Sequence, residues 1–286
     1  RLSPVIPIRV YNVPSIRSPR VAEKEAVFAK KFEILKALIK NSRSTVALTG
    51  AGISTLSGIP DFRSSSGVYA TTWKSYQVEE ILSISFFKHN PEIFYAWAKE
   101  YWYKLDDYKP NTVHTALALL EQKGYLEGLF TQNIDMLHKK AGSRKCYEVH
   151  GSAEHHHCTN CNAYYSYHWV APIVLTGQVP RCTECGSVIK PDIVFYGENL
   201  DGFTLSRAYE MFNHAQLCLV LGSSLVVQPA ASFPAYTVHR GAPLVIVNAQ
   251  KTSYDGSATL RFTDLRQFSE ALEDYLAALE IRKPLV

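Results

Sequence analysis

Four cysteines are spaced as metal ligands. Cys158 and Cys161 form one Cys-x-x-Cys pair, and Cys182 and Cys185 form a second after 20 intervening residues. Four thiolates complete the tetrahedral coordination of zinc and leave no open position, so the spacing predicts a structural zinc. Two redox dithiols or four free cysteines are the alternatives. One histidine of the run 155–157 is a further candidate ligand, although three consecutive histidines more often face solvent.

A glycine turn follows the short apolar stretch 45–49. It has the sequence Gly50-Ala-Gly-Ile-Ser54, which predicts a strand that leads into a helix. Glycines in such a turn let the backbone approach a pyrophosphate, and the N–H groups of a helix start favour an anion. The third fingerprint position is Thr55, and the acidic residue expected about 20 positions later is missing, so a hydride-transferring dehydrogenase is disfavoured while dinucleotide binding is not. A tight turn without a ligand is the alternative.

Further polar residues follow the glycine turn or a predicted strand. They occur in the segments Gly58-Ile-Pro-Asp-Phe-Arg63, Thr131-Gln-Asn-Ile-Asp135 and Val149-His-Gly151. Taken singly, each residue has an ordinary structural role as its alternative: a helix cap for Asp61, a surface ion pair for Arg63, a turn for Asn133 and Asp135, and a structural histidine for His150. Ligands bind at the carboxyl edge of an open α/β sheet, however, so together these segments predict one site. We expect Gln132, Asn133, Asp135 and His150 to converge beside the glycine turn.

Alternating strands and helices must position these residues. Apolar runs predict strands at 45–49, 126–131, 145–149, 193–196, 217–221 and 244–248, and amphipathic patterns predict helices at 21–40, 112–123 and 266–279. This alternation indicates an α/β fold with a Rossmann-like, largely parallel sheet. The aromatic-rich segment 63–109 and the cysteine-bearing segment 151–189 interrupt it, and we expect them to form an inserted helical and zinc-binding lobe. The cleft between the two lobes is the expected ligand site.

These segments divide the chain into a Rossmann-like domain and two insertions. The domain comprises 21–62, 110–150 and 190–286, the helical insertion is 63–109, and the zinc-binding insertion is 151–189. Residues 1–20 contain four arginines, four prolines and no acidic residue, and they predict an extended basic arm. A remnant of a transit peptide is the lesser alternative for the arm.

Composition excludes several classes of protein. The 286 residues are 47% hydrophobic and 20% charged, typical of a globular protein with a core, and no apolar run approaches the ~20 residues that span a bilayer. The net charge of +4 comes entirely from residues 1–20, so no basic face for nucleic acid is expected. Six cysteines are too few for a disulfide scaffold, and the unpaired Cys146 and Cys218 indicate a reducing, cytoplasmic location.

Taken together, the motifs resemble those of the sirtuin family. The three segments above, the glycine turn, the cysteine quartet, Gly222-Ser-Ser224 and Val247-Asn248 occur in that family's order, and the resemblance covers about residues 27–276. It implies an NAD-dependent protein-lysine deacylase with a Rossmann-like NAD-binding domain and a zinc lobe. NAD and the acyl-lysine of a protein or peptide would meet in the cleft between the two.

The resemblance also implies roles for individual residues. His150, Asn133 and Asp135 would be catalytic, with Asp135 accepting from the nicotinamide carboxamide. NAD would contact Gly50, Ala51, Gly52, Thr55, Asp61, Phe62, Arg63, Gln132, Asn133, Ile134, Asp135, Gly222, Ser223, Ser224, Asn248, Ala249 and Leu265. The substrate would lie as an added strand against Val194, Tyr196, Gly197 and Val227, which would also cover the acyl-lysine tunnel.

The implied reaction is chemically consistent with these residues. The acyl oxygen attacks the ribose as nicotinamide leaves, and fixed dipoles with an apolar shield stabilise the positive charge that builds on the sugar. His150, with an ordinary pKa of ~6.5, would accept the proton of a ribose hydroxyl. The expected products are nicotinamide, free lysine and O-acetyl-ADP-ribose.

Three departures from the family pattern qualify these expectations. Tyr196 stands where many relatives have phenylalanine, and its hydroxyl would alter the rim of the acyl channel. Gln250 replaces a common acidic residue, which weakens the expected adenosine contact. Relatives that remove acidic acyl groups resemble each other in a Tyr-x-x-Arg in the helical insertion, whereas no arginine occurs here from Ser64 to Ser143, which favours acetyl or other neutral acyl groups. A cation supplied by Lys74, Lys88, Lys99 or Lys104 is the alternative.

Two other functions fit parts of the sequence. A protein mono-ADP-ribosyltransferase would use the same NAD site, and the products of the reaction would distinguish it from a deacetylase. A non-enzymatic zinc-ribbon module that binds nucleic acid would require a basic zinc lobe. Residues 151–189 carry Arg181 against Glu154 and Glu184, which disfavours that module.

Overall fold

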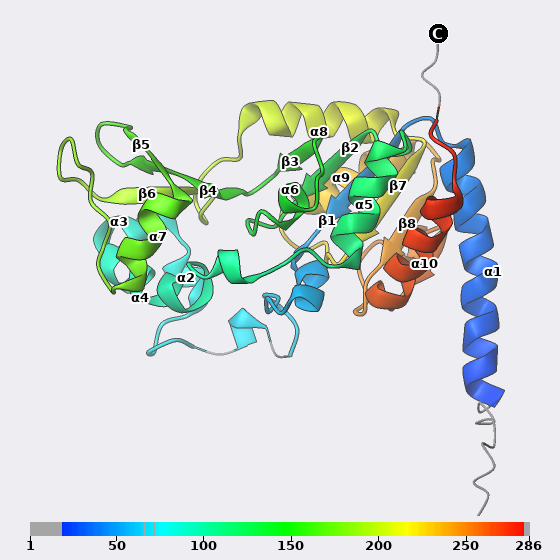
Figure 1. Cartoon of the computed structure of the whole chain (residues 1–286), viewed down its shortest axis with the longest axis horizontal. Coiled ribbons are helices and arrows are strands. Elements are labelled where there is room, and N and C mark those ends of the chain that lie inside the picture. The colour runs from blue at the N-terminus through cyan, green and yellow to red at the C-terminus, as the bar shows by residue number, and fades with distance from the viewer. Residues whose placement is uncertain (1–18, 66, 71, 283–286) are drawn as a thin grey trace, which may run out of the picture.

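The computed structural model describes residues 19–65, 67–70 and 72–282 (Figure 1). The predicted basic arm therefore lies outside the described residues, apart from its last two positions, which begin helix α1. Across the described ranges, no helix is both long and apolar enough to cross a membrane.

A parallel sheet of six strands forms the centre of the larger part of the molecule. Its strand order is β3-β2-β1-β7-β8-β9. The last residue of β1, Thr49, is level with Thr131 of β2 and Leu221 of β7. The loops that follow these three strands therefore meet at one edge of the sheet. The strands are β1 Thr45–Thr49, β2 Gly128–Thr131, β3 Cys146–Glu148, β7 Leu217–Leu221, β8 Leu244–Val247 and β9 Leu260–Phe262.

Helices cover both faces of this sheet. Successive strand residues point to opposite faces, so Ala47 packs in a core with α1, α5 and α10, whereas Val46 and Leu48 pack with α8 and α9. Helices α5 and α10 pack against each other in front of the sheet in Figure 1. The helices are α1 Pro19–Asn41, α5 Thr112–Gln122, α6 Leu137–Lys140, α8 Gly202–His214, α9 Phe233–His239 and α10 Leu265–Ala278, with 3₁₀ helices at Ala51–Ser57 (η1), Ala230–Ser232 and Asp255–Ser257.

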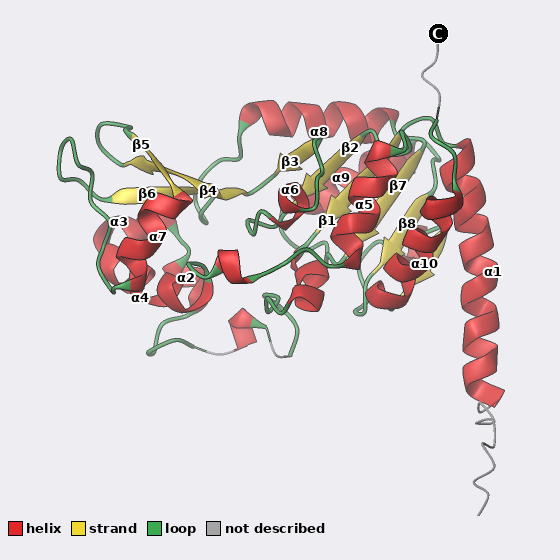
Figure 2. Ribbon diagram, in the orientation of Figure 1, coloured by secondary structure: helices red, strands yellow, loops and turns green. Residues whose placement is uncertain are grey.

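A smaller antiparallel sheet and the helices of the two insertions form the small lobe (Figure 2). The sheet has the order β5-β4-β6. Both predicted insertions contribute to its core, where the Phe94 ring lies 5.1 Å from that of Phe195 and 6.4 Å from that of Trp97. The elements are α2 Val78–Ile81, α3 Ile84–His89, α4 Pro91–Tyr101, β4 Gly151–Cys158, β5 Tyr164–Ser166, α7 Tyr167–Leu175 and β6 Ile189–Ile193, with 3₁₀ helices at Val68–Ala70 and Leu105–Asp107.

Most predicted elements are confirmed. The strands predicted at 45–49 and 217–221 match β1 and β7, and the helices predicted at 21–40, 112–123 and 266–279 agree with α1, α5 and α10 to within two residues. The α/β class with a second, zinc-type lobe is also confirmed. The proposed domain boundaries stay predictions.

Three details differ from the predictions. The strand predicted at 193–196 is wrong, because β6 ends at Ile193 and pairs with β4 of the small sheet; the apolar run instead reflects burial of Phe195 in the aromatic core. The element after the glycine turn is the 3₁₀ helix η1 rather than an α-helix. Strands β4, β5 and β9 were not predicted, since β5 and β9 have only three residues each and β4 carries the polar histidine run.

Candidate active site

A cavity of about 410 Å³ lies between the carboxyl edge of the large sheet and the small lobe. This volume is within the usual range for small-molecule sites. We call it the central cavity. It is lined by His150 and by every predicted cofactor and substrate residue except Asp135, namely Gly50, Ala51, Gly52, Thr55, Asp61, Phe62, Arg63, Gln132, Asn133, Ile134, Val194, Tyr196, Gly197, Gly222, Ser223, Ser224, Val227, Asn248, Ala249 and Leu265.

The glycine turn is shaped by a neighbouring loop. A Cβ atom on Gly52 would lie 2.8 Å from the carbonyl oxygen of Gly222, so only glycine lets the loops after β1 and β7 approach this closely. Gly222 itself has a φ of +63°. The N–H of Gly52 donates to the Gly222 carbonyl at 2.9 Å, and that of Ile53 donates to the Gly50 carbonyl. Two of the N–H groups that were expected to bind an anion therefore already donate to carbonyl groups of the protein.

Asn133 and Asp135 are linked through Ser54. The Asn133 side-chain amide donates to the Ser54 hydroxyl at 3.0 Å, and that hydroxyl donates to Asp135 Oδ2 at 2.6 Å. The other Asp135 oxygen accepts from the N–H of Leu137. Burial raises the pKa of Asp135, and these two hydrogen bonds oppose the rise. Asp135 thus lies behind the cavity wall and orients Asn133, which faces the cavity.

His150 has the geometry of a base. Its Nδ1 lies 3.1 Å from the main-chain oxygen of Gln132. A carbonyl only accepts, so Nδ1 carries the proton and Nε2 carries the free electron pair. That buried Nε2 has no hydrogen-bond partner in the described part of the chain. Burial lowers the pKa of His150 below 6.5, and the Arg63 charge lowers it further, while the bond to Gln132 partly opposes both. The imidazole is therefore neutral near pH 7.

Polar groups at the sheet edge extend the site away from His150. The Gln132 side chain donates to the Ser223 hydroxyl at 2.8 Å and so joins the loops after β2 and β7. Asn248 follows β8, and its side-chain amide donates to the Gln250 carbonyl at 3.0 Å. Gln250 also lines the cavity, so it remains beside the region where the adenosine contact was expected.

The expected substrate segment is partly used by the small lobe. The N–H of Val194 donates to the His150 carbonyl, and the N–H of Tyr196 donates to the Leu82 carbonyl, both at 2.9 Å. A substrate strand cannot accept from these two groups without displacing those bonds. All four predicted substrate residues line the cavity and stay candidates, although the N–H groups of Val194 and Tyr196 are already used.

Sequence analysis did not assign several residues to the site. Ser54 belongs to the glycine-turn motif, and its hydroxyl was the sequence signal for this role. The cavity is also lined by Tyr69, Leu200 and Gln228, which belong to none of the sequence motifs described above. The aromatic richness of segment 63–109 was the one signal for Tyr69.

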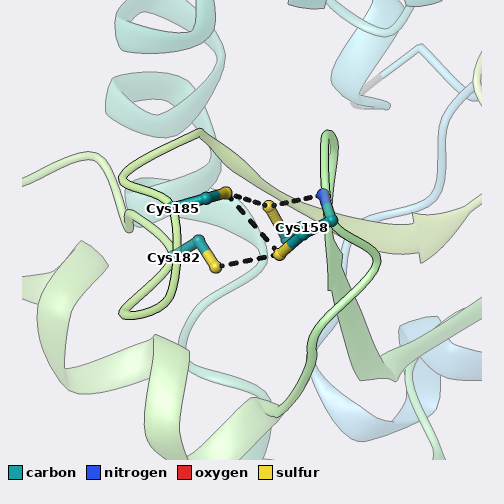
Figure 3. Close-up of side chains that lie close together, drawn as sticks. Cys158, Cys182 and Cys185 are labelled. Carbon is teal, nitrogen blue, oxygen red and sulfur yellow. Dashed lines mark hydrogen bonds between the residues drawn. The ribbon is translucent and has the colours of Figure 1, made fainter.

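The four cysteines form one cluster, and Figure 3 shows Cys158 facing Cys182 and Cys185. The four sulfurs lie within 4.8 Å of one another, with Cys158–Cys185 and Cys161–Cys182 each at 3.4 Å. Zinc with Zn–S bonds of ~2.3 Å requires sulfurs about 3.8 Å apart, so the cluster fits a structural zinc. None of the four lines the central cavity.

The three adjacent histidines have other partners. His155 pairs with Tyr164, His156 with Tyr103 at 2.9 Å, and His157 with Asp192 at 2.8 Å. His156 is fully buried, so the expectation that the run faces solvent is wrong for this residue. It lies on the inward face of β4, where strand alternation directs every second side chain into the core.

Comparison with known proteins gives consistent matches. The sequence model described as "Sir2 family" matches residues 50–229. An NAD-dependent protein deacetylase of Thermotoga maritima is 47% identical over 233 residues, which are 81% of this chain and 93% of that protein. An NAD-dependent protein deacylase of Archaeoglobus fulgidus is 43% identical over 226 residues, or 78% of this chain and 87% of that protein.

The fold also matches solved structures. A Sir2 variant with a deacetylated p53 peptide and 3'-O-acetyl ADP ribose has a TM-score of 0.80 and 44% identity, and the match covers 85% of this chain and 97% of that chain. Similarity at this level extends over both the sheet domain and the small lobe.

Proposed function

Because this chain belongs to the Sir2 family and is an NAD-dependent protein deacetylase, we propose that His150, Asn133 and Asp135 carry its chemistry in the central cavity. The reaction consumes NAD and yields O-acetyl-ADP-ribose. The observation that carries the proposal is the neutral His150, which lines the same cavity as Asn133 and whose buried Nε2 has no partner among the described residues.

NAD is held at the carboxyl edge of the sheet. The glycine turn gives the pyrophosphate close access to backbone, and Arg63 supplies a cation at the same cavity. Gln132, Ser223 and Asn248 offer polar groups for the ribose and adenosine part, together with the remaining predicted cofactor residues. This distribution supports binding of a long, charged dinucleotide rather than a compact ligand.

The nicotinamide end lies against Asn133 and Ile134. Asp135 lies behind the cavity wall and already accepts two hydrogen bonds, but a carboxylate has about four acceptor sites, so a carboxamide that enters past Asn133 can donate one more to it. Phe62 provides an apolar surface that shields the sugar after nicotinamide leaves. His150 Nε2 then takes the proton of a ribose hydroxyl, while the Gln132 carbonyl holds the ring in the required tautomer.

The acetyl-lysine of a protein or peptide enters between the segment 194–198 and the loop of Val227. The substrate backbone pairs with Gly197 and Val227, and Tyr196 contributes its ring to the rim. A neutral acyl group is favoured, as expected from the absence of arginine between Ser64 and Ser143.

The large domain and the small lobe act as two walls of the site, with boundaries as predicted from the sequence except that β6 and Phe195 belong to the small lobe. A reducing location such as the cytoplasm is supported by the six cysteines, all of which are free thiols in the structure. The four clustered thiols then remain available to zinc.

Labelled nicotinamide tests the proposed mechanism. The zinc-loaded protein is incubated with NAD and labelled nicotinamide, with and without an acetyl-lysine peptide, and exchange of label into NAD is measured. Exchange should depend on the peptide, because nicotinamide leaves as the acyl oxygen of the peptide attacks the ribose. Products should be the free-lysine peptide and O-acetyl-ADP-ribose. Equal exchange without peptide, or an ADP-ribosylated protein as the product, would overturn the proposal.

A further inference from the structure

Arg63, Tyr69 and Tyr196 form a closed set of three contacts at the wall of the central cavity. The hydroxyls of Tyr69 and Tyr196 lie 3.1 Å apart, and Arg63 Nη2 donates to the Tyr196 hydroxyl at 3.3 Å. The Arg63 guanidinium lies over the Tyr69 ring, 5.1 Å from its centre. All three line the cavity, yet the proposed reaction uses neither hydroxyl.

Tyr196 is firmly attached to the small lobe. Its N–H donates to the Leu82 carbonyl at 2.9 Å, and its carbonyl accepts from the N–H of Ile84 at 3.0 Å. The preceding residue, Phe195, is 2% exposed and packs between Phe87 and Phe94. The Tyr196 hydroxyl therefore extends into the cavity from an anchored backbone.

Arg63 and Tyr69 belong to a segment that is folded on itself. The N–H of Tyr69 donates to the Phe62 carbonyl at 2.9 Å, and the N–H of Val68 donates to the Asp61 carbonyl at 2.8 Å. The rings of Phe62 and Tyr69 lie 5.1 Å apart. These contacts shape the segment internally. The Tyr196 hydroxyl adds a polar link from Arg63 and Tyr69 to the anchored backbone of residues 195 and 196.

We propose that Tyr196 is a positioning residue whose hydroxyl holds Arg63 and Tyr69 in place before NAD binds, and so raises the affinity for NAD. Fixing a binding group in advance reduces the entropy lost on binding. The proposal rests on the proposed contacts of Phe62 and Arg63 with NAD. Phenylalanine, common at this position in the family, lacks the oxygen that makes both contacts.

The test compares Tyr196→Phe, Tyr69→Phe and the double variant. Tyr196→Phe should weaken NAD binding about threefold to tenfold, the scale of a net hydrogen bond. Calorimetry without peptide measures this affinity, and hydrogen exchange of the Val68 and Tyr69 amides should accelerate in the same variant. The double variant should bind NAD no more weakly than Tyr196→Phe, because both substitutions break the same hydroxyl contact.

Tyr236→Phe is the matched control, since it removes a hydroxyl from an exposed tyrosine of α9 outside the cavity lining. Unchanged exchange at Val68 and Tyr69 in Tyr196→Phe would overturn the proposal, and so would faster exchange with unchanged NAD affinity. Neither measurement requires turnover. Failure of the deacetylation mechanism would instead appear as peptide-independent nicotinamide exchange, so the two failures are distinguishable.

Discussion

His150 shows how one backbone contact defines the role of a side chain. The Gln132 carbonyl fixes the proton on Nδ1, and burial keeps the ring neutral, so Nε2 remains a free base beside the cavity. A histidine that is protonated on both ring nitrogens could not accept a further proton. The tautomer and the lowered pKa therefore support the same function.

His150→Ala should reduce deacetylation at least ~10²-fold, because a positioned base contributes about that much. In the unsubstituted enzyme, the neutral ring is the active form, so activity should fall only as the pH drops through a pKa below 6.5. The measurement is kcat/KM for an acetyl-lysine peptide between pH 5 and 8 under saturating NAD.

His168→Ala is the control, because this histidine side chain is 79% exposed and outside the central cavity. This variant should have the same dependence of kcat/KM on pH as the unsubstituted enzyme. Near-normal turnover of a folded, zinc-loaded His150→Ala variant would remove His150 from the role of base.

The residue types of the site could be predicted from the sequence more readily than their contacts. Motif spacing placed Asn133 and His150 at the sheet edge, and the structure brings both to one cavity. The hydrogen bond from Ser54 to Asp135 was not predictable, because it joins η1 to a loop 81 positions later. Such contacts form only when the tertiary fold brings two loops together, and a local sequence pattern does not predict which loops will meet.

At the scale of elements, strands buried on both faces were the most predictable. Their unbroken apolar runs identified β1 and β7, since both faces of the sheet are covered by helices. The run at 193–196 gave a false strand because Phe195 is buried by the small lobe rather than by a sheet. An apolar run records burial, and it indicates a strand only where the surroundings form a sheet.

The cysteine cluster joins the end of β4 to the turn before β6, at one end of the small sheet. Cys158 ends β4, whereas Cys182 and Cys185 lie in the turn before β6. Cys158 and Cys182 are both buried within the small-lobe core, and the Tyr165 hydroxyl donates to Cys182 Sγ at 3.2 Å. Loss of the metal should therefore disturb packing that extends to the helical insertion.

One zinc per chain is expected, and Cys158→Ser should lose it. Removal of zinc by a chelator should unfold the small lobe and abolish deacetylation through that unfolding. Metal content by mass spectrometry and thermal unfolding are the measurements. Cys146→Ser, which removes a thiol outside the cluster, should keep its zinc. An unchanged melting profile after zinc removal would contradict a structural role.

At the scale of the whole molecule, buried histidines occur in both cores. His114 and His138 are buried side by side, with ring centres 4.8 Å apart and ring planes tilted by 60°, and His156 is buried in the small lobe. Burial lowers the pKa of His114 to about 4 and that of His156 to about 3, and it lowers the pKa of His138 well below 6.5. Each of these rings is neutral in the folded protein near pH 7.

Stability should therefore decrease as the pH falls below 6.5. In the unfolded chain these histidines bind protons near pH 6.5, whereas in the folded protein they do so only at lower pH. Between the two values, each histidine costs about 1.4 kcal/mol of stability per pH unit, because unfolding takes up a proton. The stabilisation is complete above 6.5 and is lost toward pH 4 for His114.

His114→Asn tests this dependence on pH. The asparagine oxygen can still accept from the N–H of Asn111, which His114 Nδ1 accepts in the structure, but it does not titrate. The variant should be less stable at pH 7.5, where packing is lost, and should lose less stability than the unsubstituted protein between pH 6.5 and 5. Urea midpoints at matched zinc content give both values, and comparison of the two proteins cancels any acid release of zinc. Parallel curves would show that His114 binds protons equally in both states, and its burial would then carry no acid sensitivity.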